Sequence, residues 1–349
     1  MCIEIQSKSR PNYQVDTIYF GGGTPSILSV DDLSCIFQVI QNNWEIQENI
    51  EITIEVNPGT LSDNKIQSWI ELDINRINLG VQSFNNKHLR QLGRIHNAKA
   101  AHHAIHKLKK AGFKNIGFDL IYGIFDQTID EWNNDLRQAI SYHPQHLSCY
   151  ALTYEPNTPL YSQVQNKKIT PLPDHTVRKM MDILFQVMEQ KKYDHYEISN
   201  FAASISFRSK HNQKYWNGTP YIGLGAASHS FLENKRFWNI SNVDAYIHKI
   251  LNGCDPLENV ERLTIEQQII EFIFLELRKK EGIRIHIFDN KFPYCFTDLF
   301  SDALKELEST GYIEVTDESC RLSSNGKFFL DSICQRLVQC DYHLGKLEK

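Results

Sequence analysis

Alternating strand and helix signals over residues 16–152 constrain the fold of this chain most strongly. Five runs rich in β-branched and aromatic residues predict strands, at residues 17–20, 51–56, 76–81, 115–121 and 146–152. The segments between them have the apolar spacing of amphipathic helices. Such alternation is typical of a parallel sheet with right-handed crossovers, in either a barrel or a doubly wound sheet. We favour an incomplete barrel, because the glycines at 21–23 do not form the GxGxxG pattern of dinucleotide-binding folds.

Composition and charge exclude several classes of protein. No apolar run approaches the roughly 20 residues that cross a bilayer, and the N-terminus has no apolar signal segment, so we expect a cytoplasmic protein without a transmembrane segment. A formal net charge of −5 gives no electrostatic footprint for nucleic acid. The eight cysteines have no CxxC or other tight metal spacing, which indicates reduced thiols. Peripheral association with a membrane and the oligomeric state are left open.

The first predicted strand ends abruptly in three glycines. Without side chains at Gly21, Gly22 and Gly23, a ligand can lie directly against the main chain, and Thr24 adds a hydroxyl group. Later strands also end in small or polar residues, and parallel strands bring their carboxyl ends to one edge of the sheet. The sequence therefore predicts a small-molecule site at that edge.

Two carboxylates interrupt otherwise apolar strands. Glu55 lies in IEITIEVNP and Asp119 in NIGFDLIYG, and burial without a partner would cost each of them much of its hydration energy. Glu55 suits an ammonium group, Asp119 suits ribose hydroxyls, and Arg94, in LGRIH, suits a carboxylate. Together they suggest a nucleoside joined to an amino acid. The alternative is a purely structural ion pair between Glu55 and Arg94 that closes the barrel.

Six motifs, in one order between residues 16 and 161, carry a family resemblance. They are TIYFGGGTPS, IEVNPGTL, RINLGVQSF, LGRIHNAKAA, GFDLIYG and YALTYEPNTPLY. The chain resembles the radical S-adenosylmethionine proteins related to oxygen-independent coproporphyrinogen III oxidase, and most closely their haem chaperone (HemW-type) branch. The resemblance implies an α/β fold built on an incomplete TIM-like (β/α)6 barrel.

The resemblance also implies which residues bind S-adenosylmethionine. In this chain they are Gly22, Gly23, Thr24 and Glu55 for the methionine amino group, Arg94 for its carboxylate, Gln82 and Asp119 for the ribose, and Ile121 and Thr153 for the adenine side. No residue is assigned a catalytic role beyond holding this cofactor.

One family motif is absent from the sequence. The family carries a CxxxCxxC loop after its first barrel strand, and the three thiolates hold a [4Fe-4S] cluster. This sequence has no such loop, so the cluster expected for the family has no cysteine ligands here. The first predicted strand matches the family's second, which predicts a barrel lacking its first strand, and MCIEIQ is predicted to end the helix before it. We interpret the chain as a truncated gene model or a fragment, with a degenerate paralogue as the alternative. As it stands, it is not expected to perform radical chemistry.

A second motif, HNxxYW, lies beyond the predicted barrel. His211, Asn212, Tyr215 and Trp216 place an imidazole beside flat aromatic rings, which suits a planar macrocycle with an axial ligand. The motif resembles that of the haem chaperones, which the oxidase branch is not expected to carry. The resemblance therefore implies haem binding, with His211 on the iron. The alternative is a satisfied histidine in a small aromatic core.

The last part of the chain predicts a separate unit. From residue 264 onward, two amphipathic helices, two short strands and a closing helix are typical of a winged helix. Fifteen acidic against eleven basic residues over 264–349 argue against nucleic-acid binding. We therefore divide the chain into a radical S-adenosylmethionine partial barrel at 1–165, a linker helix and haem-motif region at 166–260, and an α+β winged-helix-like domain at 261–349.

Two functions are consistent with these motifs. The leading hypothesis is a haem-binding chaperone that uses S-adenosylmethionine and haem and delivers haem to an acceptor protein. The alternative is an enzyme of porphyrin biosynthesis similar to oxygen-independent coproporphyrinogen III oxidase, which would need the missing cluster cysteines.

Overall fold

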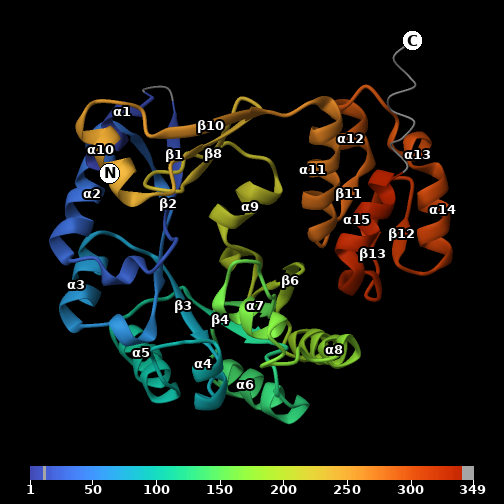
Figure 1. Ribbon diagram of the computed structural model, residues 1–349, viewed down its shortest axis with the longest axis horizontal. Coiled ribbons are helices and arrows are strands. Elements are labelled where there is room, and N and C mark those ends of the chain that lie inside the picture. The colour runs from blue at the N-terminus through green and yellow to red at the C-terminus, as the bar shows by residue number, and fades with distance from the viewer. Residues whose placement is uncertain (11–12, 340–349) are drawn as a thin grey trace. The chain divides into compact units, whose positions relative to one another are not determined.

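The computed structural model describes residues 1–10 and 13–339 and divides into two compact units. The sheet unit comprises Asn12–His195 and Ser199–Ser209, and the second unit comprises Met1–Pro11, Tyr196–Ile198 and Lys210–Lys349 (Figure 1). The division expected from the sequence, with boundaries after residues 165 and 260, stays a prediction.

Seven strands form the main sheet, in the order β1-β2-β3-β4-β5-β7-β6. The first five pair in parallel and in chain order, whereas β7 runs antiparallel to β5. The bounds are β1 Gln14–Phe20, β2 Glu45–Val56, β3 Arg76–Gln82, β4 Ile116–Tyr122, β5 His146–Ala151, β6 Asp194–Glu197 and β7 Asn200–Ala202. With β1 and β6 at its edges the sheet is open, which confirms the incomplete α/β barrel. The two short strands at 194–197 and 200–202 were not predicted.

Helices with well-defined starts connect the parallel strands. Figure 1 shows them along the outer side of the sheet: α2 Val30–Asn43, α3 Asp63–Glu71, α4 Asn86–Gln91, α5 Ala98–Lys110 and α6 Ile129–Ser141. Two more helices follow β5, α7 Pro159–Gln165 and α8 Asp174–Gln190. Ser29, Ser62, Asn97 and Thr128 cap four of them, because each side chain accepts a hydrogen bond from the N–H three residues later. No helix in residues 1–10 and 13–339 is long and apolar enough to cross a bilayer.

The two faces of the parallel strands differ sharply in polarity. Side chains alternate along a strand, and the register pairs Glu55 with Asn78 and Asp119 with Ser148, so these four share one face. The opposite face is apolar and buried, and is formed by Ile52, Ile54, Ile77, Leu79, Phe118, Leu120, Leu147 and Cys149. Parallel sheets usually bury two apolar faces. A polar face therefore indicates that this side of the sheet surrounds something other than a hydrocarbon core.

The second unit contains two small sheets. The first has the order β10-β9-β8, and the second has the order β11-β13-β12. The bounds in this unit are α1 Cys2–Ser7, α9 Lys210–Trp216, β8 His229–Leu232, β9 Lys235–Asn239, α10 Val243–Leu251, β10 Leu257–Arg262, α11 Ile265–Arg278, β11 Ile283–Arg284, α12 Ile285–Lys291, α13 Phe296–Leu299, α14 Ser301–Ser309, β12 Ile313–Val315, β13 Ser319–Leu322 and α15 Leu330–Gln339.

A phenylalanine cluster forms the core of residues 265–339. The Phe288 ring contacts those of Phe272, Phe292, Phe296 and Phe300, with centroids 4.8–5.9 Å apart in tilted or edge-on arrangements. Strands β12 and β13 pair antiparallel, as the two predicted strands of the winged-helix-like unit require. The sequence did not predict the short strand β11, which pairs with β13.

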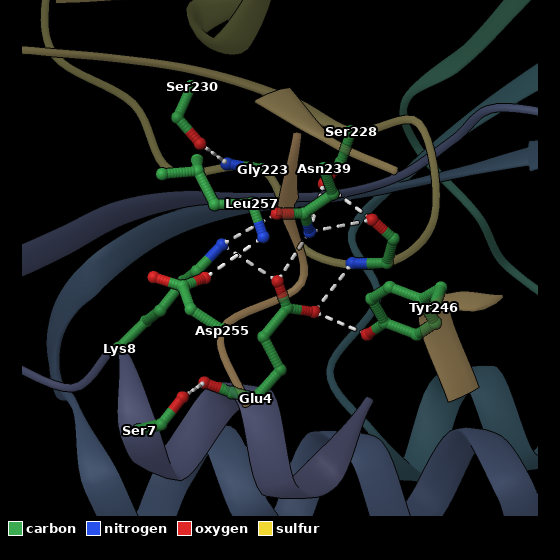
Figure 2. Close-up of polar contacts among 11 residues, drawn as sticks. Glu4, Ser7, Lys8, Gly223, Ser228, Ser230, Asn239, Tyr246, Asp255 and Leu257 are labelled. Atoms are coloured by element: carbon green, nitrogen blue, oxygen red, sulfur yellow. Dashed lines mark hydrogen bonds and ion pairs between the residues drawn. The ribbon is translucent and has the colours of Figure 1, made fainter. Parts of the chain in front are cut away.

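A buried carboxylate attaches the N-terminal helix to the rest of the second unit (Figure 2). Glu4, which is completely buried, accepts hydrogen bonds from Lys8 and Asn239 on Oε1 (2.8 and 2.6 Å), and from the Gly225 N–H and the Tyr246 hydroxyl on Oε2 (2.8 and 2.5 Å). Burial alone would raise the pKa of Glu4, but hydrogen bonds from Lys8, Tyr246 and Gly225 lower it below its ordinary value. The carboxylate is therefore charged and fully paired.

Replacing Glu4 should strongly destabilise the second unit. Glu4→Ala removes the acceptor of the Gly225 N–H and of the Tyr246 hydroxyl, and one of the acceptors of Asn239 Nδ2. We expect a loss of about 3–5 kcal/mol in the free energy of opening strand β9, measured by native-state hydrogen exchange. Glu258→Ala, at an exposed position in β10, serves as the control and should change it by less than about 0.5 kcal/mol. Equal effects of the two substitutions would contradict the role given to Glu4.

Candidate functional site

The loop after β1 presents bare backbone, as the sequence predicted. A Cβ atom added at Gly22 or Gly23 would meet no atom within 4 Å, and both glycines are exposed. Gly22 also has a φ of 82°, in the left-handed region that favours glycine. Gly21 is required for a different reason, since a Cβ there would lie 2.5 Å from the ring of Tyr19. The loop thus combines an open surface at 22–23 with one glycine that accommodates a neighbouring ring.

Glu55 lies beside this loop at the end of β2. Its Oε1 accepts a hydrogen bond of 2.8 Å from the Tyr19 hydroxyl on the neighbouring strand β1. Burial raises the pKa of the Glu55 carboxyl, and hydrogen bonds from Tyr19 and from the Gly22 N–H act in the opposite direction. A positively charged group next to Glu55 would offset the burial cost, which is the property required to bind an ammonium group.

Asp119, in β4, is the most perturbed carboxyl group on the polar face of the sheet. Burial raises the pKa of Asp119 to about 7, and the nearby charge of Glu55 adds to this shift against the hydrogen bonds from Ser148 and Asn78. Asn78 Nδ2 donates to Asp119 Oδ2 over 2.7 Å. A donor-rich ligand such as a ribose diol would give this carboxylate the hydrogen bonds that burial withholds.

Gln82 ends β3 in a strained conformation. Its φ is 64°, a left-handed value that costs a non-glycine residue of the order of 1–3 kcal/mol. The next two residues are held by Asp135 of α6, whose carboxylate accepts hydrogen bonds from the Ser83 hydroxyl (2.6 Å) and the Phe84 N–H (2.8 Å). Burial raises the pKa of Asp135 to about 6, despite these two hydrogen bonds. Asp135 thus holds the backbone turn that immediately follows Gln82.

The remaining residues expected at the cofactor lie around the same strand ends. Arg94 is exposed by area, yet partial burial of its guanidinium lowers its pKa, and the charge of Asp119 acts in the opposite direction, so the two side chains lie within electrostatic reach. No ion pair joins Glu55 and Arg94 within the described ranges 1–10 and 13–339, so the purely structural pair is not formed. Ile121 is half-buried in β4, and Thr153 is exposed two residues beyond the end of β5. Their roles near adenine stay predictions.

Sequence reasoning missed four residues of this site: Tyr19, Asn78, Asp135 and Ser148. Three of them could have been found from the period-two alternation of β1, β3 and β5, because Glu55 and Asp119 identify the polar face and the register then assigns Tyr19, Asn78 and Ser148 to it. Asp135 lies in an amphipathic helix, where nothing in the local pattern points to Ser83.

The HNxxYW motif forms helix α9 of the second unit. His211 and Tyr215 are one turn apart, and His211 Nε2 lies 2.9 Å from the Tyr215 hydroxyl, with the two rings nearly perpendicular at 89°. Tyr215 also packs edge-on against Tyr221, with centroids 4.7 Å apart. All four motif side chains are partly exposed. The arrangement holds one imidazole in a fixed orientation on a short helix lined by aromatic rings.

These residues fit two of the three cofactors expected from the sequence. The open backbone at Gly22 and Gly23, the carboxylates of Glu55 and Asp119 and the guanidinium of Arg94 match the amino-acid and ribose groups of S-adenosylmethionine. The imidazole of His211 is a side chain of the type that can ligate a haem iron. For a [4Fe-4S] cluster the residues do not fit, because no three metal-ligating side chains converge in residues 1–10 and 13–339. We therefore derive no step through a cluster.

Comparisons with known proteins identify two matching family models and several related proteins. A model of the radical SAM superfamily matches residues 3–139, and a model of the HemN C-terminal domain matches residues 263–329. The chain is 36% identical to the haem chaperone HemW of Lactococcus lactis over 330 residues, covering 91% of this chain and 85% of the relative. It is 30% identical to HemW of Escherichia coli, covering 92% of this chain and 84% of the relative.

Among solved structures, coproporphyrinogen III oxidase (HemN) from Escherichia coli is similar with a TM-score of 0.81 over 96% of this chain and 81% of that one. The sequence identity is only 20%, so this likeness concerns the fold alone.

The raised pKa of Asp119 should make the stability of the sheet unit depend on pH. Unfolding returns the pKa from about 7 to its ordinary value of 3.8, so between these values the folded state binds the extra proton and stability falls as pH rises. Asp119→Asn removes this dependence. By hydrogen exchange of β4, we expect the variant to gain roughly 2 kcal/mol over the wild type at pH 8 but little at pH 4. The exposed Asp126→Asn is the control, and a gain for Asp119→Asn independent of pH would contradict the assignment.

Proposed function

Because the chain belongs to the haem chaperone HemW family of radical S-adenosylmethionine proteins, we propose that it binds haem through His211 and delivers it to an acceptor protein. The observation that carries this proposal is the imidazole of His211 on α9, held by Tyr215 over 2.9 Å. Bound haem supplies an iron with an axial position for an imidazole and two propionate groups at the rim of the macrocycle.

The contact with Tyr215 suggests how His211 is kept ready. When Nδ1 carries the proton, the Tyr215 hydroxyl donates to the Nε2 lone pair, which is the same lone pair that an iron would use. The tyrosine therefore orients the ring and occupies the coordinating nitrogen until haem arrives. Release of haem to an acceptor is helped by the same contact, because the tyrosine hydroxyl can take the place of the iron.

The sheet unit is proposed to hold S-adenosylmethionine. Gly22, Gly23, Thr24 and Glu55 would bind the amino group, Arg94 the carboxylate, Gln82 and Asp119 the ribose, and Ile121 and Thr153 the adenine side. Bound S-adenosylmethionine would supply a cationic sulfonium and an ammonium group, whose charges Glu55 and Asp119 would balance. We place this function in the cytoplasm, and the haem acceptor is a second protein.

Substitution of His211 should abolish specific haem binding. We expect His211→Ala to weaken ferric haem binding at least tenfold and to remove the shift of the Soret band, because the axial ligand is lost. Tyr215→Phe keeps the aromatic ring but removes the hydroxyl that contacts Nε2, so this variant should bind haem as tightly as the wild type or up to about tenfold more tightly. Both are measured by spectrophotometric titration.

The control for these variants is His286→Ala, because His286 is an exposed histidine of the same unit on α12. It should leave haem binding unchanged. A Soret shift that is the same in the wild type and in His211→Ala would overturn the proposal.

A further inference from the structure

Two buried hydrogen-bond donors lack acceptors at the end of the haem-motif helix. They are the indole Nε1 of Trp216, the last residue of α9, and Nε of Arg278, the last residue of α11. The Arg278 guanidinium lies over the Trp216 ring, 4.8 Å from its centroid, so both donors belong to one stacked pair. Buried N–H groups are rarely left without an acceptor, because each has lost its water without replacement.

Backbone hydrogen bonds hold Arg278 next to a buried carboxylate. The segment Tyr196–Ile198 runs beside the end of α11, where the Ile198 N–H donates to Arg278 O and the Lys280 N–H donates to Tyr196 O. This pairing brings the buried Glu197 to Arg278, with Nη2 and Oε2 3.4 Å apart. The Nη2 group of Arg278 therefore has an acceptor in Glu197, whereas its Nε–H has none in the described part of the chain.

The neighbouring lysine is already occupied. Lys279 Nζ donates to Glu276 Oε1 (2.6 Å) and to Asn217 Oδ1 (3.0 Å). Its charge is thus balanced by Glu276, as part of the Arg278 charge is balanced by Glu197. The site is not a general cationic patch: it is a pair of directed donors that only an acceptor placed beside the Trp216–Arg278 stack can satisfy.

We propose that Trp216 and Arg278 form a carboxylate-binding site that holds a propionate group of the haem bound by His211. A carboxylate oxygen accepts from both an indole N–H and an arginine Nε–H, and charge-assisted hydrogen bonds of this kind are strong. Trp216 follows His211 by five residues, about 7.5 Å along the axis of α9. This offset suits a ligand whose iron lies at the centre of the macrocycle and whose carboxylates project from its rim.

This inference rests on the proposed haem function, and the test separates the two. Affinities for ferric haem and for its dimethyl ester, in which both propionates are neutralised, are compared by spectrophotometric titration. The wild type should bind haem about tenfold more tightly than the ester, because the ester offers no anionic acceptor. Arg278→Gln should lose about tenfold for haem and leave the affinity for the ester unchanged. Arg284→Gln, at an exposed arginine of the same unit, should change neither.

A second variant guards against misfolding, since Arg278→Gln removes the partner of buried Glu197. Trp216→Phe keeps an aromatic ring under Arg278 but deletes the indole N–H, and should lose a few-fold affinity for haem only. Equal wild-type affinities for haem and ester, or losses that are the same for both ligands in both variants, would overturn the carboxylate site while His211-dependent binding still supported the haem function. Failure of the wild type to bind either ligand would overturn both.

Discussion

The burial of carboxylates on one face of a parallel sheet is the constraint on which the sheet unit depends. Burial raises the pKa of both Glu55 and Asp119, and the charge of Glu55 adds to the shift at Asp119, so the face is costly to maintain without a ligand. The opposite face offsets that cost, because it packs Ile54, Leu79 and their neighbours in complete burial. The left-handed backbone at Gln82 also lowers the stability of the fold, and the hydrogen bond from Ser83 to Asp135 holds the next residue in place.

The second unit solves a different problem, which is to present a short helix in a defined orientation. Seven residues are too few for α9 to be stable alone, so its geometry comes from contacts such as the stack of Arg278 on Trp216 and the edge-on packing of Tyr221 on Tyr215. Glu4 contributes at another point of this unit, where it organises Gly225, Asn239 and Tyr246 around the N-terminal helix. Both contacts join residues that lie far apart in the sequence.

Local pattern predicted much of the fold, and the reasons for its failures are physical. The five parallel strands and their helices could be predicted from the spacing of apolar residues and from capping residues, because each of these patterns lies within one strand or helix. The strands at 194–202 were missed because they are short, as was β11, which has only two residues. The helix at residues 2–7 was predicted, but not its partners, because Glu4 meets Asn239 across 235 positions of sequence. Site residues in strands could be found by alternation, whereas Asp135 required the tertiary structure.

The most direct test of this account is the titration of the Asp119 carboxyl group, followed by carbon-13 NMR and assigned with Asp119→Asn. We expect an apparent pKa of about 7 without ligand, because burial and the charge of Glu55 oppose ionisation. Addition of S-adenosylmethionine, whose sulfonium and ammonium charges exceed its single carboxylate, should lower that pKa clearly. Titration near the ordinary value of 3.8, or a raised pKa that S-adenosylmethionine leaves unchanged, would contradict the claim that the polar face of the sheet is a cofactor-binding surface.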